Sequence, residues 1–295
     1  WKMVKEYPYL VGDFMWTAWD YLGETGIGAW AYTPDGKGFD KPYPWLLAAV
    51  GALDILGDPN GELFLAQAAW DLLDQPRIAV QPANHPGVKP AKAVWRGTNA
   101  LPSWSWKDCD GNRTVVEVYT GGAAVELFLN GKKLGRKKVK ECKALFSKVT
   151  YEPGEIEAIA LDAAGRETGR ARLISATGAT KLKLSPERTL LRANGQDLCF
   201  LDIDLVGENG VTRSSVDQKL TVEVTGAGTL QAFGSARPHM AEDFVSQSHT
   251  TYYGKALAVI RAGYEPGEIR VKVSGKDMEE EITLRVTADD SWEKM

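Results

Sequence analysis

The sequence predicts a mainly β chain in which a short βα unit precedes two sandwich domains, and three observations support this. Nine of the ten tryptophans lie before residue 107, so the composition changes partway along the chain. Beyond that point, short runs of alternating apolar and polar residues are separated by Gly, Asn and Asp, a pattern typical of strands and turns. The hexapeptide Tyr-Glu-Pro-Gly-Glu-Ile occurs at residues 151–156 and again at 264–269, an offset of 264 − 151 = 113 residues. Because one immunoglobulin-like domain spans about 100 residues, the repeat predicts two tandem immunoglobulin-like β-sandwiches.

Residues 1–75 have the pattern of a strand, a long loop and a helix. Residues 11–16 are short and largely apolar, which predicts a buried strand. A loop rich in Gly, Pro and Asp follows at residues 25–43. Apolar residues then recur at helical spacing over residues 62–73, with an acidic residue in the first turn and Pro76 beyond the end. Because a parallel-type strand is buried in a sheet covered by helices, we expect partner strands upstream of this chain.

The first predicted sandwich, residues 76–177, is marked by alternating runs and by turn residues. The pair Asn130-Gly131 between two such runs predicts a type I′ hairpin turn. Tyr151, which opens the repeated hexapeptide, is expected to be a corner tyrosine whose hydroxyl ties a crossover to the backbone. The expected strands are residues 77–80, 114–120, 124–129, 132–134, 145–151 and 155–162.

The second predicted sandwich, residues 178–295, begins at a Thr-Gly-Ala-Thr linker and repeats this scheme. Tyr264 opens the second copy of the hexapeptide and is expected to be its corner tyrosine. The expected strands are residues 182–184, 197–206, 220–224, 256–261, 268–273 and 281–286.

The charge balance favours a neutral ligand. The formal net charge is −4 and the pI is about 5.6, so nucleic acid and acidic membrane surfaces are not expected partners. The longest apolar run, residues 45–53, is shorter than the roughly 20 residues that span a bilayer. A basic cluster is predicted to be the solvated face of a hairpin that discourages edge pairing, with anion binding as the alternative. Its members are Lys132, Lys133, Arg136, Lys137, Lys138 and Lys140.

Neither the cysteines nor the histidines have the spacing of a metal site, and no cofactor is expected. They are Cys109, Cys142 and Cys199, and His85, His239 and His249. The cysteines are predicted to be reduced thiols, which favours the cytoplasm and leaves secretion or a periplasmic location open. The N-terminus has neither an initiating methionine nor the apolar stretch of a signal peptide, so the chain is expected to begin inside a longer protein.

Residues 11–24 are the densest segment of the chain in apolar, aromatic and acidic residues, and residues 14–24 read Phe-Met-Trp-Thr-Ala-Trp-Asp-Tyr-Leu-Gly-Glu. Residues 14–24 resemble the last barrel strand and the following loop of glycoside hydrolase family 2. Within that family they resemble the bacterial β-galactosidase branch. Residues 1–9 resemble the helix before that strand, and residues 190–210 resemble the branch's final immunoglobulin-like domain. The sandwich that follows the barrel is matched by residues 77–106, 116–135 and 151–154.

The resemblance implies that residues 1–75 are the C-terminal βα remnant of a (β/α)8 barrel that precedes the two sandwiches. It implies a retaining exo-β-glycosidase that uses two glutamates on earlier barrel strands, one as acid/base and one as nucleophile. No Asn-Glu pair of the acid/base type occurs here, so no catalytic residue is expected in this chain, which alone should be inactive. The barrel and N-terminal domains are expected upstream, and the implied substrate is a terminal β-galactoside.

By the same resemblance, four residues are candidates for one wall of the sugar site. Active sites of such barrels lie at the C-terminal ends of strands, where Trp16 falls, and its indole face suits the C–H face of a pyranose. Asp20 and Glu24 are expected to accept hydrogen bonds from sugar hydroxyls. Trp19 is a weaker candidate. The structural alternatives are core packing for the two tryptophans and loop capping for the two carboxylates.

Other functions stay open at this point. A β-glucuronidase would need a cationic partner for the substrate carboxylate, and this wall is acidic, so a neutral hexose is favoured; a β-mannosidase is a further alternative. A carbohydrate-binding sandwich would need exposed tryptophans. Trp104 and Trp106 alternate, so one is expected in the core and the other exposed. A surface adhesin of immunoglobulin-like repeats is the third alternative.

Overall fold

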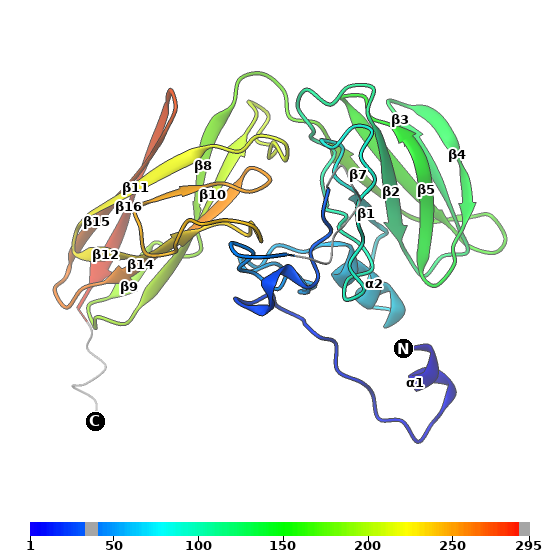
Figure 1. The fold of residues 1–295 in the computed structure, drawn as a ribbon, viewed down its shortest axis with the longest axis horizontal. Coiled ribbons are helices and arrows are strands. Elements are labelled where there is room, and N and C mark those ends of the chain that lie inside the picture. The colour runs from blue at the N-terminus through cyan, green and yellow to red at the C-terminus, as the bar shows by residue number, and fades with distance from the viewer. Residues whose placement is uncertain (33–40, 289–295) are drawn as a thin grey trace. The chain divides into compact units, whose positions relative to one another are not determined.

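The computed structural model describes residues 1–32 and 41–288, over which the chain is mainly β, as predicted. These residues contain sixteen strands, two α-helices and one short 3-10 turn (Figure 1). The chain forms two compact units, one of Trp1–Ser175 with Pro238–Met240 and one that begins at Ala176. Part of the predicted loop at residues 25–43 lies outside the described residues, and the division into three domains stays a prediction.

The first unit contains a two-sheet sandwich. One antiparallel sheet has the order β1-β2-β5, with β1 at Arg77–Val80, β2 at Arg113–Tyr119 and β5 at Lys143–Thr150. The other has the order β4-β3-β6-β7, with β4 at Lys132–Lys138, β3 at Ala124–Leu129, β6 at Glu155–Leu161 and β7 at Glu167–Ile174. The predicted strands are thus confirmed within a few residues, and β7 is additional.

The hairpin between β3 and β4 follows from its turn residues. Asn130 and Gly131 both have positive φ, 50° and 77°, as a type I′ turn requires. Strand β4 lies at a sheet edge, and most of its side chains are exposed. The predicted solvated basic face is therefore confirmed, although the strand continues four residues beyond the expected end at residue 134.

The expectation that Trp104 and Trp106 point to opposite faces is wrong. The segment that carries them is not a strand, and the two side chains are 1% and 0% exposed. The indole N–H of Trp104 donates to the Glu152 carbonyl at 3.1 Å. The backbone N–H of Trp106 donates to the Tyr151 hydroxyl at 3.0 Å. Because irregular backbone has no two-residue alternation, both side chains can be buried.

The predicted strand at residues 11–16 is also wrong. The chain leaves helix α1 (Lys2–Glu6) and runs without ladder partners among the described residues, as the deep blue trace of Figure 1 shows. The side chains of Val11 and Phe14 are 104% and 102% exposed. A strand is held by hydrogen bonds to a neighbouring strand, so an apolar run without one stays irregular.

Helix α2 spans Gly61–Ala69, so the predicted helix is confirmed but ends before residue 73. The Asn60 side chain caps it by accepting a hydrogen bond from the Glu62 N–H at 2.9 Å. At the other end, Lys5 donates to the Ala69 carbonyl at 2.7 Å, and Asp71 has a left-handed φ of 58°. The left-handed residue turns the chain out of the helix.

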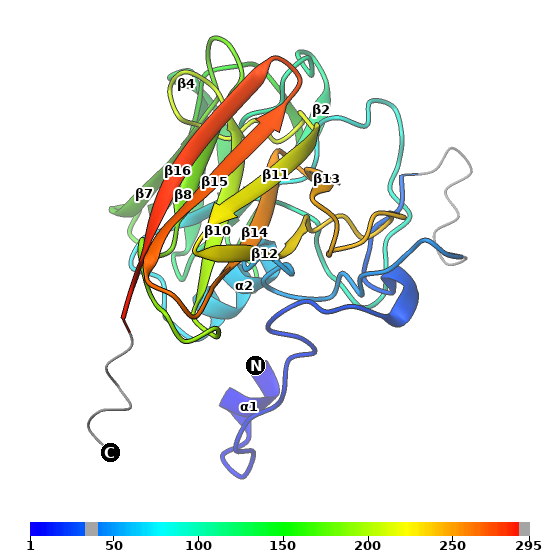
Figure 2. The same cartoon turned by 90° about the vertical axis from the view of Figure 1, so that its left-hand side faces the viewer.

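The second unit is a larger sandwich of the same kind. One sheet has the order β12-β14-β10-β8, with β12 at Gly228–Gly234, β14 at Lys255–Ala262, β10 at Leu198–Val206 and β8 at Lys181–Pro186. The other, seen in Figure 2, has the order β13-β11-β15-β16-β9, with β13 at Ser248–Thr250, β11 at Lys219–Gly226, β15 at Gly267–Gly275, β16 at Met278–Thr287 and β9 at Leu190–Arg192. The six predicted strands are confirmed, and β9, β12 and β13 are additional.

The repeated hexapeptide lies at equivalent points of the two sandwiches. The first copy joins β5 to β6 and the second joins β14 to β15, and each connection passes from one sheet to the other. Tyr151 is 2% exposed and bonds to the backbone as a corner tyrosine, which confirms that prediction. Tyr264 is 78% exposed, so its predicted corner role is wrong. Its ring lies over Gly195, where a Cβ would be 2.4 Å from Tyr264 Cζ.

Candidate functional site

Three side chains of the irregular loop at residues 16–24 form a hydrogen-bonded chain. The indole N–H of Trp16 donates to the Tyr21 hydroxyl at 3.0 Å. That hydroxyl donates in turn to a carboxylate oxygen of Glu24. The rings of Trp16 and Tyr21 meet edge to face, with centroids 6.1 Å apart. The loop therefore holds an indole and a carboxylate together through one phenol.

This cluster faces outward and keeps its polarity. Trp16 is 64% exposed, and Glu24 is also exposed. The hydrogen bond to Glu24 raises the pKa of Tyr21 above its ordinary value of 10.0, so the hydroxyl stays a donor through neutral pH. An exposed indole face beside a carboxylate is suited to stacking on a sugar ring and accepting its hydroxyl hydrogens.

The backbone that carries Glu24 is tightly turned. Glu24, Thr25 and Gly26 have successive positive φ angles of 53°, 47° and 65°. Left-handed backbone is uncommon for residues other than glycine, so the surroundings must hold this turn in place. Trp45 packs against it so closely that a Cβ on Gly26 would lie 2.5 Å from the indole Cε3.

Asp20 points into the protein rather than outward. It is 7% exposed, and its carboxylate accepts hydrogen bonds from the backbone N–H groups of Ala49, Val50 and Gly51 at 3.1, 3.0 and 3.3 Å. These contacts match the structural alternative, in which the carboxylate orders a loop. Contact between Asp20 and a sugar stays a prediction.

Trp19 is half exposed, at 54%, and is fixed against a neighbouring loop. Its indole N–H donates to the Ile55 carbonyl at 3.3 Å. The ring covers Gly57, where a Cβ would lie 2.9 Å from it. The structure thus brings Trp16 and Glu24 together through Tyr21, while Asp20 and Trp19 contact other loops. Tyr21 was not among the predicted site residues, because its role depends on side-chain contacts with Trp16 and Glu24 that the sequence does not specify.

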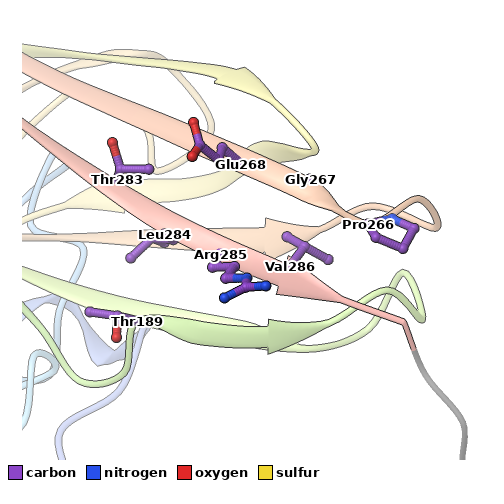
Figure 3. A pocket seen from close by; sticks show the side chains of 8 residues that line it. All are labelled: Thr189, Pro266, Gly267, Glu268, Thr283, Leu284, Arg285 and Val286. Carbon is purple, nitrogen blue, oxygen red and sulfur yellow. The ribbon is translucent and has the colours of Figure 1, made fainter.

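A separate open hollow of about 500 Å³ lies on the second sandwich (Figure 3). It is lined by Thr189, Pro266, Gly267, Glu268, Thr283, Leu284, Arg285 and Val286. Glu268 and Arg285 are opposite each other on β15 and β16, and no lining side chain is aromatic. The hollow lacks the stacking surface expected of a sugar-binding sandwich.

Cys109, Cys142 and Cys199 form no disulfide in the described part of the chain. The described residues contain no group of three or more His, Cys, Asp and Glu side chains placed to bind a metal. Within residues 1–32 and 41–288, no helix is long and apolar enough to cross a membrane.

The described residues contain an irregular aromatic loop that is followed in sequence by two immunoglobulin-like sandwiches. Residues 182–283 match the model for glycoside hydrolase family 2 C-terminal domain 5, and residues 111–169 match a domain of unknown function. A crystal structure of a glycosyl hydrolase family 2 member from Bacteroides cellulosilyticus is similar, with a TM-score of 0.85 and 32% identity, covering 97% of this chain and 37% of that one. Residues 182–283 thus match a glycoside hydrolase family 2 C-terminal domain, and the chain is similar to a C-terminal portion of members of that family.

Two curated relatives agree with this assignment. A protein named beta-galactosidase from Bacteroides ovatus is 26% identical over 98% of this chain and 30% of its own length. A protein named putative beta-glucuronidase from Formosa agariphila is 25% identical over 92% of this chain and 23% of its own length. The chain spans less than a third of the length of either relative.

Proposed function

We propose that this chain is the C-terminal part of a retaining exo-β-glycosidase, and that its loop at residues 16–24 forms one wall of the sugar site. The observation that carries the proposal is the exposed Trp16 indole, held beside the Glu24 carboxylate by Tyr21. Similarity to glycoside hydrolase family 2 supports the reaction class. The barrel-remnant role of residues 1–75 belongs to the same proposal and is supported by the similarity of the chain to a C-terminal portion of glycoside hydrolase family 2 members.

In this proposal the chain binds and orients the sugar and does not perform the chemistry. Trp16 offers a rigid apolar floor for the C–H face of the terminal sugar. Glu24 accepts a hydrogen bond from a sugar hydroxyl on one oxygen while the other is held by Tyr21. The acid/base and nucleophile glutamates of the retaining mechanism come from elsewhere in the whole protein, so these 295 residues alone are inactive.

A terminal β-galactoside is the proposed substrate. A glucuronide would place its carboxylate near Glu24 and would need a cation to offset the repulsion. Lys41 packs beside this turn, but it donates to the carbonyls of Gly26 and Ala29 and lies 5.2 Å from the centroid of the Trp45 ring. Its ammonium group is therefore engaged in holding the loop. The name of the Bacteroides ovatus relative agrees with a galactoside, and that of the Formosa agariphila relative keeps a glucuronide as the alternative.

Nitrophenyl glycosides test the proposal with the full-length protein and with this 295-residue chain. We expect the full-length protein to release nitrophenol from the β-galactoside and this chain to release none. Trp16→Ala in the full-length protein should raise KM about tenfold or more, because the stacking surface is lost. Tyr43→Ala, which removes an aromatic side chain that is 74% exposed, is the matched control. Hydrolysis of glucuronides alone would refute the galactoside, and an unchanged KM for Trp16→Ala would refute the site.

A further inference from the structure

A segment from late in the sequence pairs with the loop region of the first unit. Pro238–Met240 belongs to the first unit although the residues on either side of it belong to the second. The Leu46 N–H donates to the Pro238 carbonyl at 2.8 Å, and the Met240 N–H donates to the Pro44 carbonyl at 3.0 Å. Met240 is 5% exposed, so the segment is anchored by a buried side chain.

The opposite edge of residues 44–48 pairs with the candidate site. The Leu46 carbonyl accepts from the Gly23 N–H at 2.6 Å, and the Ala48 N–H donates to the Tyr21 carbonyl at 3.0 Å. Leu46 therefore donates its N–H to residues 238–240 and accepts with its carbonyl from residues 21–23. The three segments form a short ladder in the order 21–23, 44–48 and 238–240.

Side chains follow the same path as the backbone. The His239 ring packs on the Trp45 ring with centroids 4.8 Å apart and an interplanar angle of 37°. Trp45 in turn closes over Gly26, at the end of the left-handed turn that carries Glu24. Two successive packing contacts thus connect His239 with the backbone of the sugar-site wall.

We propose that Pro238–Met240 is a positioning element for the sugar site, and that His239 acts through Trp45 to hold the turn carrying Glu24. The effect of His239 on sugar binding rests on the proposed function. The packing of His239 and Trp45 behind the turn at residues 24–26 does not depend on it. The turn at residues 24–26 has unfavourable left-handed backbone and no strand of its own, so its geometry depends on what packs behind it. His239 contributes ring packing, so phenylalanine should replace it and alanine should not.

Hydrogen exchange on this 295-residue chain tests the positioning independently of any activity. His239→Ala should speed exchange in peptides covering residues 20–27 and 44–48 by about two- to tenfold, the range expected for one lost aromatic contact. His239→Phe should restore the slower exchange. Val245→Ala, at an 81% exposed position in the same connection between β12 and β13, is the matched control. Unchanged exchange at residues 20–27 in His239→Ala would overturn the proposal.

Kinetics on the full-length protein test the consequence for the site. His239→Ala should raise KM for the hydrolysed glycoside by about two- to tenfold with kcat less affected, because the sugar-binding wall moves while the catalytic glutamates stay in place. His239→Phe should restore KM. A loss of kcat with unchanged KM would overturn the role of His239 at the site. If the wild-type enzyme hydrolyses no glycoside, the proposed function fails, and the exchange experiment still decides the positioning.

Discussion

The hydroxyl of Tyr151 accepts a hydrogen bond from the backbone N–H of Trp106 at 3.0 Å, inside the core of the first sandwich. The same hydroxyl lies 3.2 Å from the Ser175 Oγ, which donates to the Trp104 carbonyl at 2.6 Å. One buried phenol therefore connects the crossover between the sheets, the irregular tryptophan segment and the end of β7. The second copy of the hexapeptide has no such arrangement around Tyr264, which is exposed.

Tyr151→Phe should destabilise the chain by about 1–3 kcal/mol, because it leaves the Trp106 N–H buried without its acceptor. Tyr264→Phe should change the free energy of unfolding by less than about 0.5 kcal/mol, as expected for an exposed hydroxyl. Urea denaturation of the two variants provides the comparison within one repeated sequence. Equal losses would contradict the assignment of Tyr151 alone as a corner tyrosine.

The glycines of the two hexapeptides should also differ. Gly154 has φ of 130°, and a Cβ there would lie 1.9 Å from Asn130 Oδ1. Asn130 cannot move without losing hydrogen bonds, since it accepts from the Glu155 N–H at 2.9 Å and donates to the Pro153 carbonyl at 3.0 Å. Gly267 lacks positive φ, and its Cβ would meet only the Ala227 methyl, at 3.1 Å.

We therefore expect Gly154→Ala to lower the free energy of unfolding by about 1–3 kcal/mol. Gly267→Ala should have less than about half of that effect. Thermal and urea unfolding measure both. A loss of stability for Gly267→Ala larger than that for Gly154→Ala would show that the close approach of Gly154 to Asn130 does not determine the destabilisation.

Asp20→Asn should destabilise the loop at residues 49–51. The carboxylate accepts three backbone N–H groups there, whereas an amide offers one acceptor oxygen and turns its own N–H groups toward donors. The expected loss is about 1–3 kcal/mol in urea denaturation. Asp13→Asn, at an exposed position of the same segment, should be nearly neutral. A neutral Asp20→Asn would remove the structural explanation and favour direct sugar contact.

The free energy of unfolding of the second sandwich should vary with pH because of Asp197. This carboxylate accepts from the Arg192 Nη2 at 2.8 Å and from the Arg192 backbone N–H at 2.9 Å. These bonds lower the pKa of Asp197 from its ordinary value of 3.8 to about 2. Because the folded-state pKa is the lower one, the contribution to stability is fully present above pH 3.8 and is lost as the pH falls through about 2.

Asp197→Asn should thus cost about 1 kcal/mol at pH 7, where solvent screens part of the interaction, and almost nothing at pH 2. Urea denaturation at both pH values measures the difference. The idea fails if the variant and the wild type lose stability in parallel between pH 4 and pH 2.

The fold was predictable from sequence wherever local pattern and tertiary pairing agree. Strand β3 was predicted to the residue because alternation and an Asn-Gly turn bound it. Strands β9 and β13 have three residues each, too few for alternation to be read. Residues 11–16 have strand-like composition, but a strand also needs a neighbour, which a single chain segment does not specify.

The candidate site was predictable only in part. Trp16 and Glu24 were selected by residue type, while Tyr21, which joins them, is defined by side-chain geometry that spacing alone does not give. Asp20 and Glu24 are both carboxylates of the same segment, so residue type did not distinguish them, but Asp20 points inward. His239 is more than 200 residues from this loop in sequence, so no local pattern connects it with Trp45.

Tyr21→Phe should separate Trp16 from Glu24 while keeping the ring in place. The change removes the acceptor of the Trp16 indole N–H and the donor to the Glu24 carboxylate. In the full-length protein, the indole should lose its fixed orientation, and KM for the hydrolysed glycoside should rise about two- to tenfold, the equivalent of one hydrogen bond. Tyr43→Phe, which removes a hydroxyl from an exposed tyrosine, should leave KM unchanged. The free energy of unfolding should change by less than about 0.5 kcal/mol in both variants, so a rise in KM for Tyr21→Phe would reflect the site itself. An unchanged KM for Tyr21→Phe would mean that the chain from Trp16 to Glu24 does not contact the sugar.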